Sequence, residues 1–476
     1  MPDSNRPNMV AIDLGAESCR VSLLEWRNQT PRIELIHRFA NAPILQDEGL
    51  HWNLDRILSE LESGLLRTAE RVSTPIASIG VDGWAVDYVR LTEHGLPVAQ
   101  PFCYRDTRTE AVEAELNRRY SAEQMFALTG VQPLRINSLY QLMADQKAGI
   151  PAETRWVNLP EYVLARFGGR FVAEFTNATH TGLVDITTRD WSPAAFELSG
   201  LSMAATPELV PCGTDLGKVE GPLQRLQAFS ETRLVAPACH DTASAVAGVP
   251  LHGDDWAYIS SGTWSLVGTV LDAPIKTAAA CAAGFTNFGG AGDRVCFHKN
   301  VNGMWLLKQT LTHLCPQNNV WPMEELVAAA EQAAVPEGLL EVDDPALWLQ
   351  GQMASRINAQ RKHRGLQPIE EHPSEMPVFA SLIFHSLASH YAKVLRNVEE
   401  LTGKRLNRVA IVGGGSLNRF LNRLTSQATG LELSRGLAES STVGNFAIQL
   451  ATLEGAPNSR SRISHWAQVL AFAGEF

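Results

Sequence analysis

Two aspartates stand at points in the sequence where phosphate chemistry is feasible. Asp13 ends the apolar run "MVAI" and precedes the small residues of "LGAES", while Asp241 follows His240 in "ACHDTASAV". Phosphoryl transfer needs donors or a metal ion to hold the phosphate charge, and one base aimed at the attacking hydroxyl. Asp241 suits the role of that base. The simpler alternative is that Asp241 or Thr242 caps a helix by accepting hydrogen bonds from its first turn.

Three turns made of small residues could bring backbone N–H groups close to phosphate oxygens. The first follows Asp13, the second is "SSGTW", and the third is "VGGGSLN". Each turn taken alone is more typical of an ordinary bend, with Trp264 in the core in the second case. The third turn lacks the G-x-G-x-x-G spacing, so a dinucleotide-binding fold fits poorly. The small residues of the three turns are Gly15, Ala16, Ser18, Gly262, Thr263, Gly413, Gly414 and Gly415.

The elements that must position these residues follow a similar pattern in both halves of the chain. Apolar runs predict strand, turn and strand over residues 9–26 and again over residues 256–272. In the first half, a further strand "RIELIHRFA" precedes a helix over residues 54–72 and a buried strand over residues 76–82. The apolar stripe expected on that helix consists of Leu54, Ile57, Leu58, Leu61, Leu65 and Leu66.

The second half continues with a long helix over residues 376–401, then a strand, a glycine loop and a helix over residues 408–424. Residues 315–375 are acidic and proline-rich without strong periodicity, which predicts a peripheral insertion. A chain of 476 residues is too long for one hydrophobic core. Two α/β lobes with a cleft between them are therefore expected, with the break near residues 240–255.

Composition narrows the class of protein. A formal net charge of −11 argues against a surface built to neutralise nucleic-acid phosphates. No uncharged run approaches the roughly 20 residues that a membrane span needs, and no signal peptide is visible. The seven cysteines contain no C-x-x-C pair and are typical of reduced thiols. We expect a cytoplasmic protein, monomeric or homodimeric, with no nucleic-acid or membrane partner.

A series of stretches, taken together, resembles the FGGY carbohydrate kinases of the actin, hexokinase and Hsp70 superfamily. They include "AIDLGAESCRV", "IGVDGWAVDYVRL", "YRDTRT", "NSLYQL", "EFTNATHTGLVDI", "HDTASAV", "YISSGTWSLVG", "IVGGGSLN" and "GNFAIQLATL". The resemblance implies an α/β fold of two ribonuclease-H-like lobes, with mixed sheets flanked by helices and an interlobe catalytic cleft. The N-terminal lobe is expected over residues 1–245, with an insertion over 84–190, and the C-terminal lobe over residues 246–476.

The same resemblance implies a role for each candidate residue. Asp241 would be the general base that takes the proton from the 1-hydroxyl of a ketose, and Asp13 and Asp241 would hold Mg²⁺. The sugar would contact Ala85, His240, Asp241, Thr242 and Asn300. The second substrate would be ATP, bound by Gly15, Ala16, Glu17, Ser18, Cys19, Arg20, Gly262, Thr263, Lys308, Gly413, Gly414 and Gly415.

Three residues depart from the family pattern. Cys19 and Ala85 stand where glycine is usual, and Lys308 stands where glutamine is usual. Within the family, the resemblance favours L-rhamnulose as the ketose, with L-fuculose or xylulose as alternatives. A superfamily ATPase without a sugar substrate and a sugar-binding protein without turnover are the other classes considered.

Two of the motifs also have purely structural alternatives. His240 could serve only to orient Asp241. The residues Arg105, Asp106 and Arg108 of "YRDTRT" are more typical of an ion-pair cluster that braces a loop than of a catalytic group.

Overall fold

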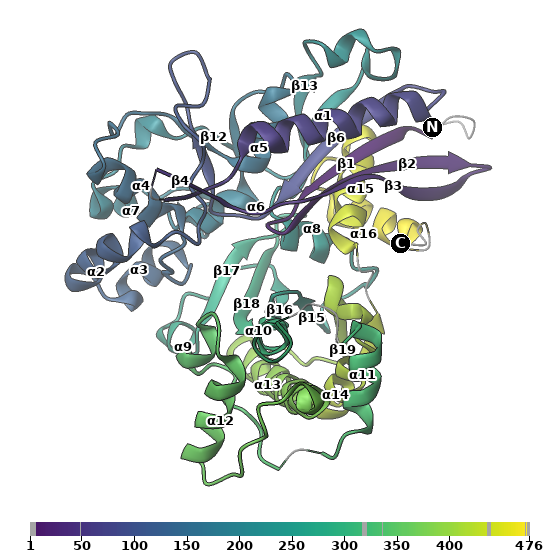
Figure 1. Cartoon of the computed structure of the whole chain (residues 1–476). Helices are drawn as coiled ribbons and strands as arrows, with labels where there is room; N and C mark the ends of the chain where they lie inside the picture. The colour runs from purple at the N-terminus through teal and green to yellow at the C-terminus, as the bar shows by residue number, and fades with distance from the viewer. Residues whose placement is uncertain are drawn as a thin grey trace. The chain divides into compact units, whose positions relative to one another are not determined.

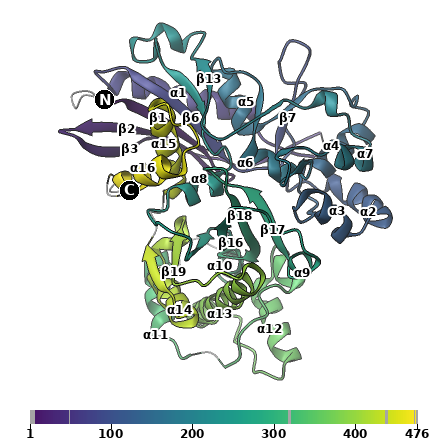
Figure 2. The ribbon, with the colours of Figure 1, turned by 180° about the vertical axis from the view of Figure 1, so that it is seen from behind.

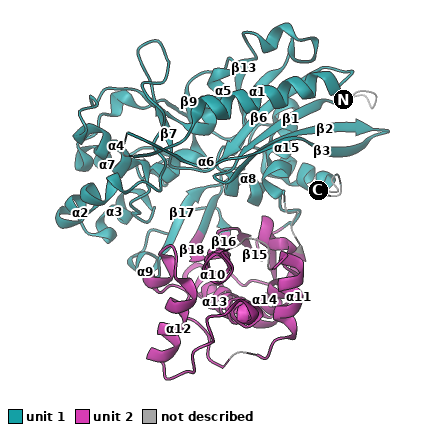
Figure 3. Cartoon of the chain, in the orientation of Figure 1, with its two compact units in different colours: residues 1–252, 270–297, 439–476 teal, residues 253–269, 298–438 magenta. Residues whose placement is uncertain are grey.

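The chain folds into two compact units, coloured separately in Figure 3. The computed structural model describes residues 6–47, 49–316, 321–335, 337–435, 439–471 and 473. Unit 1 consists of residues 1–252, 270–297 and 439–476, and unit 2 consists of residues 253–269 and 298–438. Among the described residues, none of the helices has both the length and the apolar character needed to cross a membrane.

Unit 1 is built on a six-stranded mixed sheet with the order β13-β14-β6-β1-β2-β3. Strand β1 runs parallel to β6 and antiparallel to β2, so the centre of the sheet combines both kinds of pairing. The strands predicted from the apolar runs are confirmed as β1, β2, β3 and β6. The sheet comprises β1 (Asn8–Leu14), β2 (Ser18–Arg27), β3 (Thr30–Ala40), β6 (Ile76–Gly83), β13 (Thr214–Lys218) and β14 (Arg233–Ala236).

Helices cover both faces of this sheet, as Figures 1 and 2 show. On one face, α1 (Leu54–Arg71) and α5 (Leu159–Arg166) pack on the strands, and the apolar residues of β1 that alternate with Asp13 enter the shared core. On the other face lie α8 (Asp241–Ala247) and α15 (Ser440–Leu453). Because side chains alternate along a strand, Asp13 faces α15. Leu66, predicted on the buried stripe of α1, is instead 48% exposed.

The remaining elements of unit 1 are short. Most of them lie between β6 and β14, in the segment that carries the motifs "YRDTRT", "NSLYQL" and "EFTNATHTGLVDI". They are β4 (Ile44–Gln46), β5 (Gly49–His51), β7 (Tyr88–Arg90), α2 (Glu110–Arg119), α3 (Ala122–Thr129), α4 (Ser138–Lys147), β8 (Trp156–Asn158), β9 (Val172–Glu174), α6 (Phe175–Ala178), β10 (Val184–Asp185), β11 (Asp190–Trp191), α7 (Pro193–Ser199), β12 (Glu208–Val210), α9 (Ala278–Ala282), β17 (Phe285–Gly289) and α16 (Arg460–Leu470).

Unit 2 contains β15 (Trp256–Ser261), β19 (Arg408–Val412) and β20 (Glu432–Arg435), together with most of β16 (Trp264–Leu271) and β18 (Val295–Asn302). These strands belong to a second six-stranded sheet with the order β17-β18-β16-β15-β19-β20. The predicted long helix is α13 (Met376–Thr402), and the helix after the glycine loop is α14 (Arg419–Thr429).

The segment over residues 315–375, expected to be a peripheral insertion, holds two regular helices within its described part. They are α11 (Met323–Gln332), which packs on α13, and α12 (Met353–His363), which packs on α10 (Trp305–Leu314). Leu326 and Ala330, one helical turn apart, are buried in α11. A short apolar stripe of this kind is easily missed in a segment rich in acidic residues and proline.

Candidate active site

Strand register places three charged residues side by side at the end of the unit 1 sheet. Asp13 of β1 pairs with Arg20 of β2 on one side and with Asp82 of β6 on the other. Residues that face each other in register project to the same face of the sheet. The Arg20 guanidinium lies 3.7 Å from Asp13 Oδ2 and also pairs with Glu439, immediately before α15. Asp13 and Asp82 therefore lie in the same row of the sheet as one arginine, Arg20.

Helix α15 supplies the polar partners of both carboxylates. Ser441 Oγ donates to Asp13 Oδ2 at 2.6 Å, and Asn445 Nδ2 donates to Asp82 Oδ2 at 2.6 Å. Asp82 is fully buried, and burial together with the charge of Asp13 raises its pKa well above the usual range. Asp82 Oδ1 has no hydrogen-bond partner among the described residues. Asp82 was not among the site residues predicted from the sequence, although its position at the end of a predicted buried strand was an available signal.

Asp241 is the first residue of α8, close to the end of β6. Gly83 N donates to the carbonyl of Cys239 at 2.9 Å, which joins the segment before α8 to that strand. The helix begins after His240, so neither Asp241 nor Thr242 is its capping residue. Burial and then the charge of Asp13 raise the pKa of Asp241 to about 7, although Thr242 Oγ1 donates to it at 3.1 Å. Its side chain nevertheless remains 37% exposed.

His240 is positioned to act on Asp241 as a neutral ring. Its Nε2 lies 3.4 Å from Asp241 Oδ1, and its ring centroid is 3.8 Å from that of His180. Burial lowers the pKa of His240 to about 3, so the imidazole carries no charge near neutral pH. A neutral ring can orient the carboxylate without neutralising it.

Two buried side chains hold the backbone just before Asp241. Glu174 Oε2 accepts hydrogen bonds from Cys239 N at 2.9 Å and from Thr176 Oγ1 at 2.5 Å. Thr176 Oγ1 in turn lies 3.4 Å from His240 N. Burial raises the pKa of Glu174 to about 7, although these hydrogen bonds favour its charged form. The motif "EFTNATHTGLVDI" thus fixes the two peptides that lead into Asp241.

Glycines allow α8 and α15 to cross at backbone contact. A Cβ at Gly444 would lie 1.8 Å from Ser244 O, and a Cβ at Gly248 would lie 2.3 Å from Ser440 O. Only glycine permits so close an approach. The crossing sets Asp241 at the start of α8 and Ser441 at the start of α15 on the same face of the sheet as Asp13.

The expected sugar-contacting residues divide between the units. Ala85 follows Trp84, whose backbone N–H donates to Leu14 O at 3.0 Å, so the loop starts beside the end of β1. Ala85 and Thr242 are both buried, with 9% and 7% exposure. Unit 1 therefore contains Ala85, His240, Asp241 and Thr242 close to the ends of β1 and β6. Asn300 is an exposed residue of β18 in unit 2.

The first small-residue turn joins β1 to β2 in unit 1. A Cβ at Gly15 would lie 2.3 Å from Ser18 O, so the tight turn requires glycine at that position. Ala16 is half-buried and Glu17 is exposed. Cys19 is fully buried in the core of the sheet, and its Sγ donates to Gly15 O at 3.6 Å. Burial raises the pKa of the Cys19 thiol to about 12, which identifies the side chain as a packing element.

The two small-residue turns of unit 2 meet at Ser261. A Cβ at Gly415 would lie 1.9 Å from Ser261 Oγ, and one at Gly413, where φ is 78°, would lie 2.9 Å from Ser261 O. Both positions therefore require glycine. Gly414 is exposed between them. The two turns of unit 2 are therefore in direct contact.

Helix α10 is attached to the "SSGTW" turn. Met304 N donates to Gly262 O at 3.1 Å, and Trp305 N donates to Thr263 O at 3.0 Å. Lys308 lies one turn further along α10 and is exposed. Trp264, considered as a core residue in the alternative interpretation, is 40% exposed instead.

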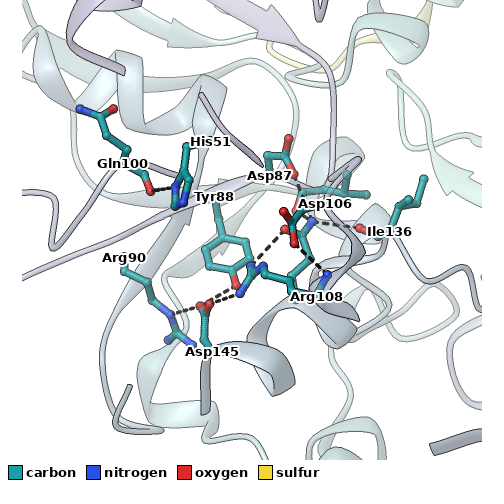
Figure 4. A network of polar contacts seen from close by, with 11 residues as sticks. His51, Asp87, Tyr88, Arg90, Gln100, Asp106, Arg108, Ile136 and Asp145 are labelled. Carbon is teal, nitrogen blue, oxygen red and sulfur yellow. Dashed lines mark hydrogen bonds and ion pairs between the residues drawn. The ribbon is translucent and has the colours of Figure 1, made fainter. Parts of the chain in front are cut away.

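Asp106 and Arg108 of "YRDTRT" brace a loop, as the structural alternative predicts (Figure 4). Arg108 forms an ion pair with Asp145, which also accepts from Arg90 Nε at 2.8 Å. Asp106 Oδ2 accepts from Leu50 N at 2.8 Å. Arg105 Nε donates to the hydroxyl of its neighbour Tyr104 at 3.2 Å. The motif therefore connects its loop to the segments that carry Asp145 and Leu50.

Two solved structures share the fold of this chain over most of their length. A xylulose kinase from Lactobacillus acidophilus matches with a TM-score of 0.77 at 14% sequence identity, covering 97% of this chain and 92% of that one. A glycerol kinase from Plasmodium falciparum, solved with ADP, matches with a TM-score of 0.73 at 14% identity, covering 98% and 94%. At these identities, the likeness establishes the fold.

The sequence establishes the family. Residues 8–248 match the N-terminal domain of the FGGY family of carbohydrate kinases, and residues 257–453 match its C-terminal domain. The chain belongs to the FGGY family and is a phosphotransferase. A rhamnulokinase from Enterobacter is 37% identical over 94% of this chain and 90% of its own length. Another, from Enterococcus faecalis, is 34% identical over 93% and 88%.

Proposed function

We propose that this kinase transfers the γ-phosphoryl group of ATP to the 1-hydroxyl of L-rhamnulose. The observation that carries the proposal is the exposure of Asp241. The Asp13 side chain is 5% exposed and Asp82 is fully buried, whereas the Asp241 side chain is 37% exposed and can meet a substrate. Two relatives named rhamnulokinase, each matched over most of its length, support the choice of sugar.

Asp241 acts as the general base in this proposal. The 1-hydroxyl oxygen attacks the γ-phosphorus, the bond from that phosphorus to the β–γ bridging oxygen breaks, and the hydroxyl proton passes to the Asp241 carboxylate. A base titrating near the working pH is efficient in such a step, and the pKa of Asp241 is raised to about 7 by burial and by Asp13. His240 keeps the carboxylate oriented through its Nε2 contact.

The residues around Asp13 fit a magnesium ion. Mg²⁺ prefers carboxylate oxygens and usually keeps several waters while it contacts the phosphates. Asp13 and Asp82 stand side by side with one arginine, and Asp82 Oδ1 lacks a hydrogen-bond partner among the described residues. We assign Asp13 and Asp241 to hold the ion, because the charge of Asp13 raises the pKa of Asp241 and the two carboxylates therefore lie within electrostatic range of each other. When bound, Mg²⁺ would offset the negative charge of the ATP phosphates.

ATP is assigned to residues of both units. In unit 1, the turn from Gly15 to Arg20 offers backbone N–H groups and the Arg20 guanidinium. In unit 2, the phosphates are assigned to Gly262 and Thr263 and the adenosine to the surface formed by Gly413, Gly414 and Gly415. Lys308, an exposed residue of α10, would add positive charge toward the nucleotide.

A panel of ketoses tests the choice of sugar. We expect kcat/KM with Mg-ATP to be highest for L-rhamnulose among L-rhamnulose, L-fuculose, L-xylulose, D-xylulose and D-ribulose. A substrate without the matching hydroxyl leaves a buried polar group unpaired, which lowers kcat/KM by about 5- to 150-fold. Another ketose preferred by about tenfold or more would replace L-rhamnulose, whereas no phosphorylation of any ketose would contradict the proposed reaction.

A further inference from the structure

The loop assigned to the sugar contains a strained residue. Val86, directly after Ala85, has φ of 73°, in the left-handed region that β-branched residues rarely adopt. Val86 is buried, with 6% exposure. Such a conformation is unfavourable and persists only where surrounding contacts determine it, often at a functional site. Because Ala85 directly precedes Val86, the contacts that hold Val86 also determine the position of Ala85.

Two side chains of α4 hold the Val86 carbonyl. Ser138 Oγ donates to Val86 O at 2.6 Å, and Gln141 Nε2 lies 3.2 Å from the same oxygen. Gln141 Nε2 also lies 3.0 Å from Ile136 O and 3.1 Å from Asp87 Oδ1. Ser138 and Gln141 are both buried, and both belong to the motif "NSLYQL", to which the proposed reaction gives no role.

Asp87, the residue after Val86, is held in place by hydrogen bonds to its carboxylate. Asp87 Oδ2 accepts hydrogen bonds from Trp52 Nε1 at 2.5 Å and from Trp84 Nε1 at 2.9 Å, and the carboxylate is fully buried. The backbone N–H of Tyr104 donates to the same oxygen at 3.3 Å. Relaxation of Val86 toward a negative φ would consequently have to move the chain on the Ala85 side.

Helix α4 is itself anchored to strand β7, which follows the loop. Asp145 of α4 accepts from Tyr88 Oη at 2.7 Å and from Arg90 Nε at 2.8 Å, and it pairs with Arg108 (Figure 4). The donors that hold Val86 therefore project from a helix fixed to the same segment of chain.

We propose that Ser138 and Gln141 are positioning residues that keep Val86 in its strained conformation and so present Ala85 to the sugar. This inference rests on the proposed function, because Ala85 is assigned to the sugar there. It gives the motif "NSLYQL" a role in sugar affinity rather than in chemistry. Loss of either donor lets the loop relax, which weakens sugar binding without touching the residues assigned to ATP.

The test compares Ser138→Ala with Ser199→Ala, a matched loss of a buried hydroxyl. Ser199 Oγ donates to Ala195 O within its own helix, α7. We expect S138A to raise KM for the preferred ketose by about fivefold or more, the usual scale of one lost hydrogen bond. KM for ATP in S138A should stay within about twofold of the wild-type value. In S199A, KM for the ketose and KM for ATP should both stay within about twofold of the wild-type values. Equal ketose KM values in S138A and S199A would overturn the proposal.

Further variants distinguish an effect on the Val86 conformation from a general loss of folding. Glycine adopts a positive φ without strain, so the V86G variant has no strain at this position for Ser138 to hold. Adding S138A to V86G should therefore raise the ketose KM by only about twofold or less relative to V86G alone. If S138A raises the ketose KM by the same factor in the wild type and in V86G, Ser138 does not act by holding Val86 in its strained conformation. Thermal unfolding checks that each variant is folded, and Gln141→Met, which removes the other donor, replaces S138A if that variant does not fold. A wild-type enzyme that phosphorylates no ketose would instead refute the proposed function.

Discussion

Three carboxylates of unit 1 differ in exposure, and this difference separates their expected roles. Asp82 is fully buried and hydrogen-bonded by Asn445, and Asp13 is nearly buried and hydrogen-bonded by Ser441. Only Asp241 keeps a substantial exposed fraction. A group that must reach a sugar hydroxyl has to be accessible, so Asp241 is the candidate base and the other two carboxylates shape the charge around it.

Replacing Asp241 with asparagine tests the base directly. D241N keeps the shape of the side chain and removes its basicity, so kcat should fall by roughly 10² or more. Nucleotide binding should persist, because the residues assigned to ATP are unchanged; fluorescence titration with an ATP analogue measures this. A variant that phosphorylates the sugar at close to the parental rate would exclude Asp241 as the base.

A half-buried ion-pair cluster in unit 2 makes stability depend on pH. Burial alone would raise the pKa of Asp343, but hydrogen bonds from His390 and Lys299 outweigh it and lower the pKa to about 2. A carboxyl whose pKa is lower in the folded state stabilises the fold above its unfolded pKa, and this contribution is lost as pH falls through the folded value.

Asp343→Asn should therefore cost more stability near neutral pH than in acid. Urea unfolding of wild type and D343N at about pH 6 and about pH 3 measures the difference. We expect the gap in free energy of unfolding to shrink at the lower pH. A gap of the same size at both pH values would show that the carboxyl gains nothing from its contacts with His390 and Lys299.

At the scale of elements, the crossing of α8 and α15 is the contact on which the site most depends. Gly444→Ala would improve the intrinsic helix propensity of α15 by about 1 kcal/mol. The added Cβ would, however, meet the backbone of Ser244 at 1.8 Å, so the helices must separate. We expect net destabilisation of about 1–3 kcal/mol, typical of overpacking, in chemical denaturation.

Gly64→Ala in α1 is the matched control for this prediction. Its Cβ would meet Val21 Cγ2 at 2.7 Å, the end of a side chain, whereas the atom beside Gly444 belongs to the backbone. G64A should therefore be less destabilising than G444A. If G444A is as stable as the wild type, the close helix crossing is not needed to hold Asp241 and Ser441 in place.

Sequence patterns predicted the local elements well. Strands β1, β2 and β6 and helices α1 and α13 were recognised from apolar periodicity, which is a property of a short stretch of chain. The turn glycines were recognised for the same reason, since a tight turn restricts its own residues.

Contacts between distant segments could not be predicted in this way. The pairing of Asp13 with Asp82 depends on strand register, and their donors Ser441 and Asn445 lie more than 350 positions away in the sequence. The hydrogen bond from Cys239 to Glu174 also joins segments 65 residues apart. A single sequence carries no periodic signal for such contacts. The motifs "GNFAIQLATL" and "EFTNATHTGLVDI" were recognised in the sequence. The contacts that their polar residues make are visible only in the structure.

At the scale of the whole molecule, unit 1 is assembled from three separate parts of the chain. The C-terminal part returns to the first sheet as α15, where Gln449 Nε2 donates to Val10 O at 3.0 Å and Gln449 Oε1 accepts from Ser78 Oγ at 2.6 Å. The polar partners of Asp13 and Asp82 are on this same helix. The carboxylate site is therefore complete only when the last segment of the chain has packed on the first.

The role proposed for Asp241 predicts that nucleotide turnover depends on the sugar. Asp241 abstracts a proton only from a correctly placed acceptor, and a bound sugar occupies the position that water would otherwise take. ADP release without ketose should therefore be slower by about 10²-fold or more than with L-rhamnulose, since the contribution of a positioned base and acceptor is lost. D241N provides the control, because a contaminating ATPase would be unaffected by it. ATP hydrolysis at the same rate with and without every ketose, abolished by D241N, would favour the sugar-independent ATPase class and refute the kinase mechanism proposed for Asp241.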